Sequence, residues 1–136
     1  MLVAKITPEI AQHCEKYTSD DLPWQRQQQV LGFTYTDISA DLLKIWQLPE
    51  KIIMPIRFFN QAQDIQINKD VKVLYLASRL ALIDSNSDEF TNEALIDNDL
   101  CDALGLSSDD LTQVNEVACE EAGSILALMN PKLFSQ

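Results

Sequence analysis

The chain has 136 residues, with 21 acidic against 10 basic side chains and a formal net charge of −11. That length suits one domain, and a hydrophobic fraction of 46% with only 3 glycines and 5 prolines argues against disorder and turn-rich β folds. The negative charge repels nucleic-acid phosphates and anionic membranes, and no apolar run approaches the roughly 20 residues that span a bilayer. We therefore expect neither a nucleic acid nor a membrane as partner.

The cysteines give a second indication of environment. Cys14, Cys101 and Cys119 are widely spaced, and no pair has the close spacing of a metal or redox site. We expect free thiols in a reducing compartment. No apolar leader-like segment follows Met1, so the predicted location is the cytoplasm.

Helical periodicity dominates the first half of the chain. A short helix is predicted from about Pro23 to Gly32, with Gly32 as its C-cap, and a second helix starts near Thr34 or Thr36. Trp46 ends the apolar side of the second helix, which predicts that it packs in the core. The apolar positions recur every three or four residues: Leu31, Tyr35, Ile38, Leu42, Ile45 and Trp46.

A proline separates that helix from the next. Pro49 suits the first turn of a helix, and Glu50 adds negative charge at the positive end of the helix dipole. Pro55 is predicted to kink the same helix. Residues 61–69 are polar and predict a loop, at the end of which Asn68 can cap the following helix.

Residues 71–83 are predicted to form the central buried helix, because their apolar arc is wide. Residues 84–89 are polar and acidic and predict a loop. From Thr91 or Asn92 a short helix, with or without a break, ends at Gly105. The apolar arc of the central helix contains Val73, Leu76, Ala77, Leu80 and Ile83, with Leu74 and Ala81 beside them.

The last helix has the clearest start signal, because Ser107 and Asp110 fit a capping box. With no strand alternation elsewhere, the prediction is an all-α fold, a compact multi-helix bundle forming one domain over residues 1–136. The stripe expected to be buried is Leu111, Val114, Ala118, Ala122, Ile125 and Met129, and Pro131 is expected to end the helix.

Few side chains suggest chemistry. The only histidine, His13, adjoins Cys14, and neighbours on a helix point about 100° apart, which favours a surface histidine beside a core cysteine. Residues 84–88 resemble the start of a calcium loop. Glu89 then stands where glycine is needed and Leu95 where glutamate is needed, so a solvated acidic loop is the better interpretation.

Two further acidic residues, Glu116 and Glu120, lie one helical turn apart and could act as a carboxylate pair. No histidine or arginine near them in sequence would divide their roles, so they predict a solvated helix face. A glycine-rich phosphate loop cannot be built from three separated glycines, and no Gly-x-Ser-x-Gly nucleophile motif is present.

Residues 30–49 fit the pattern L-G-[FI]-x-H-x-x-[IV]-G-A-x-L-L-x-x-W-x-L-P at most positions, and residues 71–82 fit an I-V-x-L-A-D-x-L-A pattern. On these motifs the chain resembles the HD-related output domain (HDOD) family, most specifically over residues 30–82. The resemblance implies an all-α fold related to metal-dependent HD phosphohydrolases, in bacterial signalling or regulation, generally without demonstrated catalysis. The matching residues are Leu31, Gly32, Phe33, Ile38, Ala40, Leu42, Leu43, Trp46, Leu48 and Pro49.

The departures from the family pattern fall on its metal ligands. Tyr35 aligns with the first family histidine, Phe58 and Phe59 with the paired histidines, and Ser78 with the aspartate of the later helix. Imidazole and carboxylate hold catalytic metals, whereas phenylalanine has no donor atom. We therefore predict no bound metal, no cofactor and no catalytic residue. Tyr35, Phe58, Phe59 and Trp46 are expected to be core, pocket or partner-groove residues.

The family domain also has an N-terminal helical half, whereas only 29 residues precede Val30 here. That half is expected to be absent, and its loss would uncover apolar faces. Because large exposed apolar patches are rare on monomers, a homodimer is one hypothesis.

Three functions from different classes follow. The favoured one is a non-catalytic bacterial signalling or regulatory module that binds a protein partner or itself. The alternative is an HD-type divalent-metal phosphohydrolase that uses carboxylates such as Asp37 and Asp41, which share a helix face. The third is a small-ligand sensor with an apolar cavity where the metal site would be.

Overall fold

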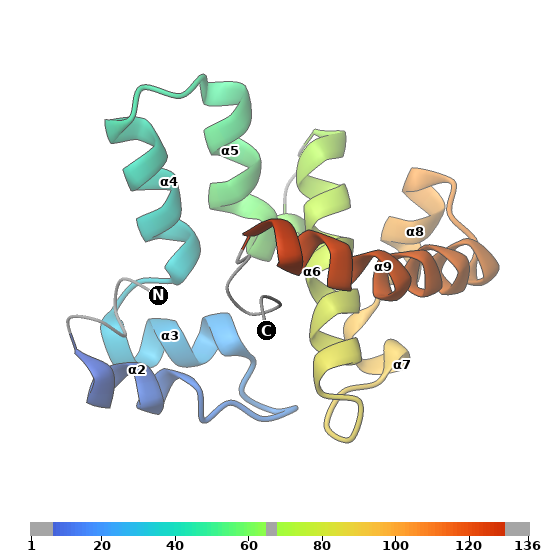
Figure 1. Cartoon of the computed structure of the whole chain (residues 1–136), viewed down its shortest axis with the longest axis horizontal. Helices are drawn as coiled ribbons and strands as arrows, with labels where there is room; N and C mark the ends of the chain where they lie inside the picture. The colour runs from blue at the N-terminus through green and yellow to red at the C-terminus, as the bar shows by residue number, and fades with distance from the viewer. Residues whose placement is uncertain (1–6, 65–67, 130–136) are drawn as a thin grey trace. The chain divides into compact units, whose positions relative to one another are not determined.

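The computed structural model describes residues 7–64 and 68–129, and its architecture is all-α (Figure 1). Within those ranges the only β-type pairing is an isolated bridge between Thr18 and Asp21. The predicted all-α fold is therefore confirmed. Contacts divide the chain into a first unit that ends at Ile96 and a second unit that begins at Asp97. The single domain over residues 1–136 stays a prediction.

The first unit opens with α2 (Pro8–Cys14) and α3 (Pro23–Leu31), which pack against each other. Pro23 occupies the first turn of α3, where a missing N–H is tolerated. Gly32 ends the helix at φ 79°, a left-handed conformation that glycine adopts at little cost. The predicted helix and its glycine C-cap are confirmed.

The next helix, α4 (Tyr35–Ile45), begins at a capping box. The Asp37 N–H donates to Thr34 Oγ1 at 3.3 Å, and the Thr34 N–H donates to the Asp37 carboxylate at 2.9 Å. This confirms the helix start predicted near Thr34. A short turn over residues 46–49 leads into α5 (Glu50–Phe58), which lies beside α4 (Figure 1).

Pro49 is the N-cap of α5, one position before its first helical residue, and Pro55 lies inside the helix. The chain continues as the 3₁₀ segment η1 (Phe59–Asp64), which is kinked at Gln61, so the loop predicted from residue 61 is wrong as far as residue 64. A 3₁₀ turn needs no apolar period and often extends the end of an α-helix, which is why polarity alone missed it. Residues 65–67 lie outside the described residues.

The predicted cap of α6 (Lys69–Ser85) is confirmed, because Asn68 Oδ1 accepts a hydrogen bond from the Val71 N–H at 3.1 Å. The predicted buried face is only partly right. Val73 and Leu74 are exposed, and the buried side is formed by other positions. The apolar arc of α6 is wide enough for more than one side to be buried. Packing against α5, η1 and α7 determines which side that is. The buried residues of α6 are Val71, Tyr75, Leu76 and Arg79.

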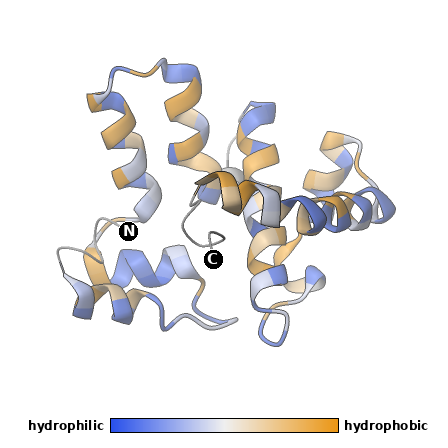
Figure 2. Ribbon diagram, in the orientation of Figure 1, coloured by the Kyte–Doolittle hydropathy of each residue, from blue (hydrophilic) through white to orange (hydrophobic). Residues whose placement is uncertain are grey.

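The core of the first unit is small and comes from α2, α4, α5, α6 and the segment after α6. Phe90 and Val71 are its largest fully buried side chains. Figure 2 shows hydrophobic and hydrophilic residues alternating along α4 and α5, the amphipathic pattern that the sequence predicts. The buried apolar residues of this unit are Ala11, Cys14, Ala40, Ile53, Val71, Tyr75, Leu76, Phe90 and Leu95.

The helix predicted between residue 91 or 92 and Gly105 is broken into α7 (Asn92–Leu95) and α8 (Asn98–Leu104), which confirms the broken alternative. Asp97 caps α8, because its side chain accepts a hydrogen bond from the Asp99 N–H at 3.0 Å. Gly105 then ends α8 at φ 70°.

The last described helix, α9 (Ser108–Met129), starts at the predicted capping box. The N–H and hydroxyl of Ser107 both donate to the Asp110 carboxylate, and these hydrogen bonds hold the pKa of Asp110 below its ordinary value. The predicted buried stripe is wrong: no residue of α9 is buried, and Met129 is 79% exposed. Spacing makes a helix amphipathic, but burial needs a covering element, and the second unit supplies only α8 among its described residues. Pro131 lies outside the described residues.

Candidate functional site

Three of the positions singled out by the family pattern meet in the first unit. Tyr35 from α4, Phe59 from η1 and Ser78 from α6 line one cleft of about 380 Å³, which we call the aromatic cleft. None of the described residues that line it carries a formal charge at neutral pH, although the whole chain has a net charge of −11. The lining residues are Tyr17, Pro23, Trp24, Gln27, Tyr35, Thr36, Phe59, Asn60, Ser78, Ala81, Leu82, Ser85 and Asn86.

The other two predicted positions lie elsewhere. Phe58 is half-buried at the end of α5 and does not line the cleft. Trp46 is 62% exposed at the C-cap of α4, so its predicted core packing is wrong. The chain reverses immediately after Trp46, through Gln47 at φ 59°, and this position therefore lies past the interface between α4 and α5.

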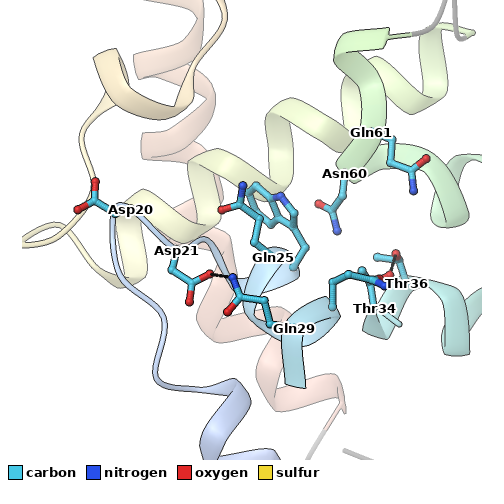
Figure 3. Close-up of a pocket in the computed structure, with 10 residues that line it drawn as sticks. Asp20, Asp21, Gln25, Gln29, Thr34, Thr36, Asn60 and Gln61 are labelled. Carbon is cyan, nitrogen blue, oxygen red and sulfur yellow. Dashed lines mark hydrogen bonds between the residues drawn. The ribbon is translucent and has the colours of Figure 1, made fainter. Parts of the chain in front are cut away.

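A second, larger cleft of about 660 Å³ adjoins the first and shares Trp24, Thr36 and Asn60 with it. We call it the amide cleft, because side-chain amides predominate in its lining. In Figure 3 Asp20 and Asp21 stand at one end, and the side-chain amide of Asn60 points toward Thr34 and Thr36. The lining residues are Asp20, Asp21, Trp24, Gln25, Gln28, Gln29, Thr34, Thr36, Asn60 and Gln61.

A buried cation lies behind the wall that the two clefts share. Arg79 is only 3% exposed, and its guanidinium carbon lies 4.1 Å from the centre of the Trp24 ring and 3.5 Å from that of Tyr75. Burial lowers the pKa of Arg79, and the Tyr75 side chain partly opposes that shift. Among the described side chains, which leave out those of residues 62–64 and 93, no carboxylate forms an ion pair with it. Cation–π contacts therefore replace the usual counter-ion.

Arg79 also makes two hydrogen bonds to residues of the aromatic cleft. Its Nη1 donates to Asn60 Oδ1 at 3.2 Å and to Ser78 Oγ at 2.9 Å, and Ser78 Oγ in turn donates to the Tyr75 carbonyl at 2.8 Å. Because a guanidinium only donates, the oxygen of the Asn60 amide must face Arg79. The amino group of Asn60 is thereby turned away from the cation.

Gln27, another residue that lines the aromatic cleft, is also held through its amide oxygen. Its Oε1 accepts a hydrogen bond from the Tyr35 N–H at 2.8 Å, which occupies the amide oxygen. Neither the Gln27 nor the Asn60 amino group has a hydrogen-bond partner among the described residues. The aromatic cleft is therefore lined by two oriented amides whose amino groups no described residue occupies.

Tyr35 lies close to buried Cys14 from α2. Burial raises the pKa of the Tyr35 hydroxyl, and the Cys14 side chain raises it further. Tyr35 is thus a neutral phenol in the cleft wall. His13, next to Cys14, is exposed, which confirms the predicted surface histidine beside a core cysteine.

The carboxylates named for the phosphohydrolase alternative have other partners. Asp37 accepts from the Thr34 N–H and hydroxyl in the α4 capping box, and Asp41 pairs with Arg57 of α5. Neither lines a cleft. Within residues 7–64 and 68–129 no group of three or more His, Cys, Asp or Glu is placed to hold a metal ion.

Sequence reasoning missed Arg79, Asn60 and Gln27. The one visible signal was Arg79 inside the largely apolar segment 71–83. Arginine is rarely buried without a partner, so its position predicts either a polar partner or exposure of that side of the helix. The two amides gave no signal, since their roles depend on contacts between helices.

Searches against family models, curated proteins and solved structures found no match. No described helix is long and apolar enough to cross a membrane.

Proposed function

We propose that this chain is a non-catalytic signalling or regulatory module of the bacterial cytoplasm, similar to HD-related output domains, that works by binding. The observation that supports this is the aromatic cleft, where Tyr35, Phe59 and Ser78 come together at the positions aligned with the family's metal ligands. A phenol, a phenyl ring and a hydroxyl that already donates to a backbone carbonyl form a poor ligand set for a catalytic metal.

The engaged carboxylates favour binding over phosphoester hydrolysis. A metal bound by Asp37 would have to displace the Thr34 hydrogen bonds that start α4, and one bound by Asp41 would have to displace Arg57. The first exchange would remove the cap of α4, and the second would break the ion pair that joins α4 to α5.

This gives a direct test of the proposed function. With Mg²⁺ or Mn²⁺ and a panel of phosphoesters and nucleotides, we expect no turnover above that of the Asp37→Ala chain. Turnover that Asp37→Ala abolishes, while the matched Asp88→Ala chain with its exposed loop position retains it, would establish the enzyme instead. A stoichiometric transition metal bound near Tyr35 and Phe59 after purification would also contradict the proposal.

Small-ligand sensing is the second candidate, and the cleft volume of about 380 Å³ favours it. Sites for small molecules commonly have volumes of about 300–1,000 Å³, with apolar walls and a few fixed polar groups. The aromatic cleft has that composition, with Trp24, Tyr35 and Phe59 in its walls and the amides of Gln27 and Asn60 as fixed polar groups.

A protein partner would contact the turn between α4 and α5, which we call the tip. Ile45 and Trp46 are 74% and 62% exposed there, and exposed tryptophans are frequent anchors of interfaces. Lys44 and Lys51 flank them, with Glu50 beside Lys51, so residues 44–51 carry two positive charges and one negative charge on an otherwise acidic chain. The tip therefore fits an apolar pocket with an acidic rim.

Sedimentation tests whether that partner is a second copy. A dimer at micromolar concentration should be weakened about tenfold or more by Trp46→Ala, and Val73→Ala, at an exposed position of α6, should leave it intact. A wild-type chain that sediments only as a monomer would exclude self-association through the tip. The proposed partner at the tip would then be a different protein.

A further inference from the structure

The aromatic cleft offers hydrogen-bond donors and a nearby positive charge but no acidic group. Its two fixed amides, Gln27 and Asn60, have their oxygens occupied by the Tyr35 N–H and by Arg79, so their amino groups are the ends that no described residue occupies, and Asn60 lies at the wall shared with the amide cleft. A third amide, Asn86, instead donates its own amino group to the Leu82 carbonyl at 3.2 Å. The selective orientation of Gln27 and Asn60 therefore favours a ligand that accepts hydrogen bonds.

Arg79 adds a charge preference to that donor set. A buried guanidinium without a carboxylate partner raises the electrostatic potential of the wall formed by Trp24, Asn60 and Ser78. An anion beside Asn60 would supply a counter-charge that no described carboxylate side chain provides. Because the protein carries −11 overall and Arg79 is the one cation that the described residues place at this wall, a single negative charge fits better than a phosphate dianion.

The remaining lining defines the rest of the ligand. Tyr17, Trp24, Tyr35 and Phe59 present aromatic surface, on which a flat ring packs favourably. We propose that the aromatic cleft binds a small aromatic monocarboxylate, with its ring against these side chains and its carboxylate accepting a hydrogen bond from the Asn60 amino group. Gln27 provides a second donor in the same cleft. This inference rests on the proposed binding function and names its ligand class.

The two tryptophans allow a clean experiment. Trp24 lines the cleft, whereas Trp46 lies at the exposed tip, so the Trp46→Phe chain has one indole N–H signal that reports on the cleft. We would titrate ¹⁵N-labelled Trp46→Phe protein with benzoate and 2-naphthoate, and with the neutral amides benzamide and 2-naphthamide, at constant ionic strength. Acetate is the control ligand that carries a carboxylate but no aromatic ring.

The Trp24 signal should shift saturably with the acids, and each acid should bind about tenfold or more tightly than its amide, because a charged acceptor strengthens the hydrogen bond and is attracted by the Arg79 guanidinium behind the wall. Asn60→Asp replaces the donor by a carboxylate of the same shape, and it should abolish acid binding. Asn98→Asp makes the same charge change at an exposed position of α8 and should leave binding unaltered. Circular dichroism would verify that both variants remain folded, which we expect because the new carboxylate in Asn60→Asp would lie beside the Arg79 guanidinium.

Two results would overturn the inference. Equal affinity for acids and amides would show that the cleft binds aromatic rings without discriminating between charged and neutral ligands. The proposed binding function would then still stand. No shift of the Trp24 signal with any acid would remove this ligand class. Neither result depends on turnover, which decides the proposed function separately.

Discussion

Phe90→Ala is expected to lower the free energy of unfolding by about 3–5 kcal/mol. Phe90 is 2% exposed and is one of the two largest fully buried side chains. Its ring stacks on Tyr17 with 6.2 Å between the ring centres, so it supports a wall of the aromatic cleft from behind. Truncation removes apolar burial and leaves a cavity that the short turn before α7 has few side chains to refill. In a small domain stabilised by about 5–15 kcal/mol, that loss is a large fraction of the total.

Urea unfolding followed by circular dichroism measures this effect. Phe33→Ala is the matched control, because Phe33 is 40% exposed in the turn before α4 and should lose about 1 kcal/mol or less. Equal destabilisation by the two substitutions would show that Phe90 is not a core residue, and the arrangement of the segment after α6 would then be wrong.

Arg79 gives the second large effect, and its sign depends on the replacement. Arg79→Ala removes a long buried side chain between two aromatic rings and leaves the Asn60 oxygen without its donor, so we expect a loss of about 2–5 kcal/mol. Arg79→Met keeps most of the volume and removes the buried charge. Because burying a charge costs several kcal/mol, which the cation–π contacts and hydrogen bonds only partly offset, we expect Arg79→Met to unfold within about 1 kcal/mol of wild type or at higher denaturant.

The comparison separates packing from charge at one position. If Arg79→Met were as damaging as Arg79→Ala, the cation–π contacts and hydrogen bonds would be net stabilising. The charge of Arg79 would then contribute to the stability of the fold. If Arg79→Met is tolerated, the buried guanidinium is retained at no benefit to stability, as expected for a group that serves a ligand. Arg57→Met, which breaks the exposed pair with Asp41, should change stability by less than about 1 kcal/mol and serves as the control for removing a positive charge.

Local signals in the sequence predicted much of the fold. Gly32 and Gly105 end helices in left-handed conformations, and Thr34, Asn68 and Ser107 begin them through hydrogen bonds to nearby N–H groups. Such caps are made within a few residues of the chain, and the residue types alone therefore predict them.

Burial was harder to predict, because it depends on contacts between elements. The stripe on α9 has helical spacing yet stays exposed, and α6 buries Tyr75 and Arg79 rather than Val73 and Leu74. Trp46 has the composition of a core residue, but it lies past the end of the helix pair that would have covered it. Apolar spacing identifies a face that can be buried, and tertiary packing decides whether it is.

The candidate site was predicted in part. The family pattern pointed to Tyr35, Phe59 and Ser78, which do share a cleft, and to Phe58, which does not line it. The amide orientations of Gln27 and Asn60 could not be predicted, because each is set by a partner 8 or 19 residues away along the chain. The function of the cleft therefore depends on pairings that no linear motif records.

The most direct test of binding through this cleft is the pair of indole N–H signals in the wild-type chain during titration with 2-naphthoate. Trp24 lines the cleft and Trp46 lies at the exposed tip, so the two signals report on separate places. We predict a saturable shift of the Trp24 signal with the Trp46 signal unchanged. A shift confined to Trp46, or no shift of either signal up to millimolar ligand, would contradict the account.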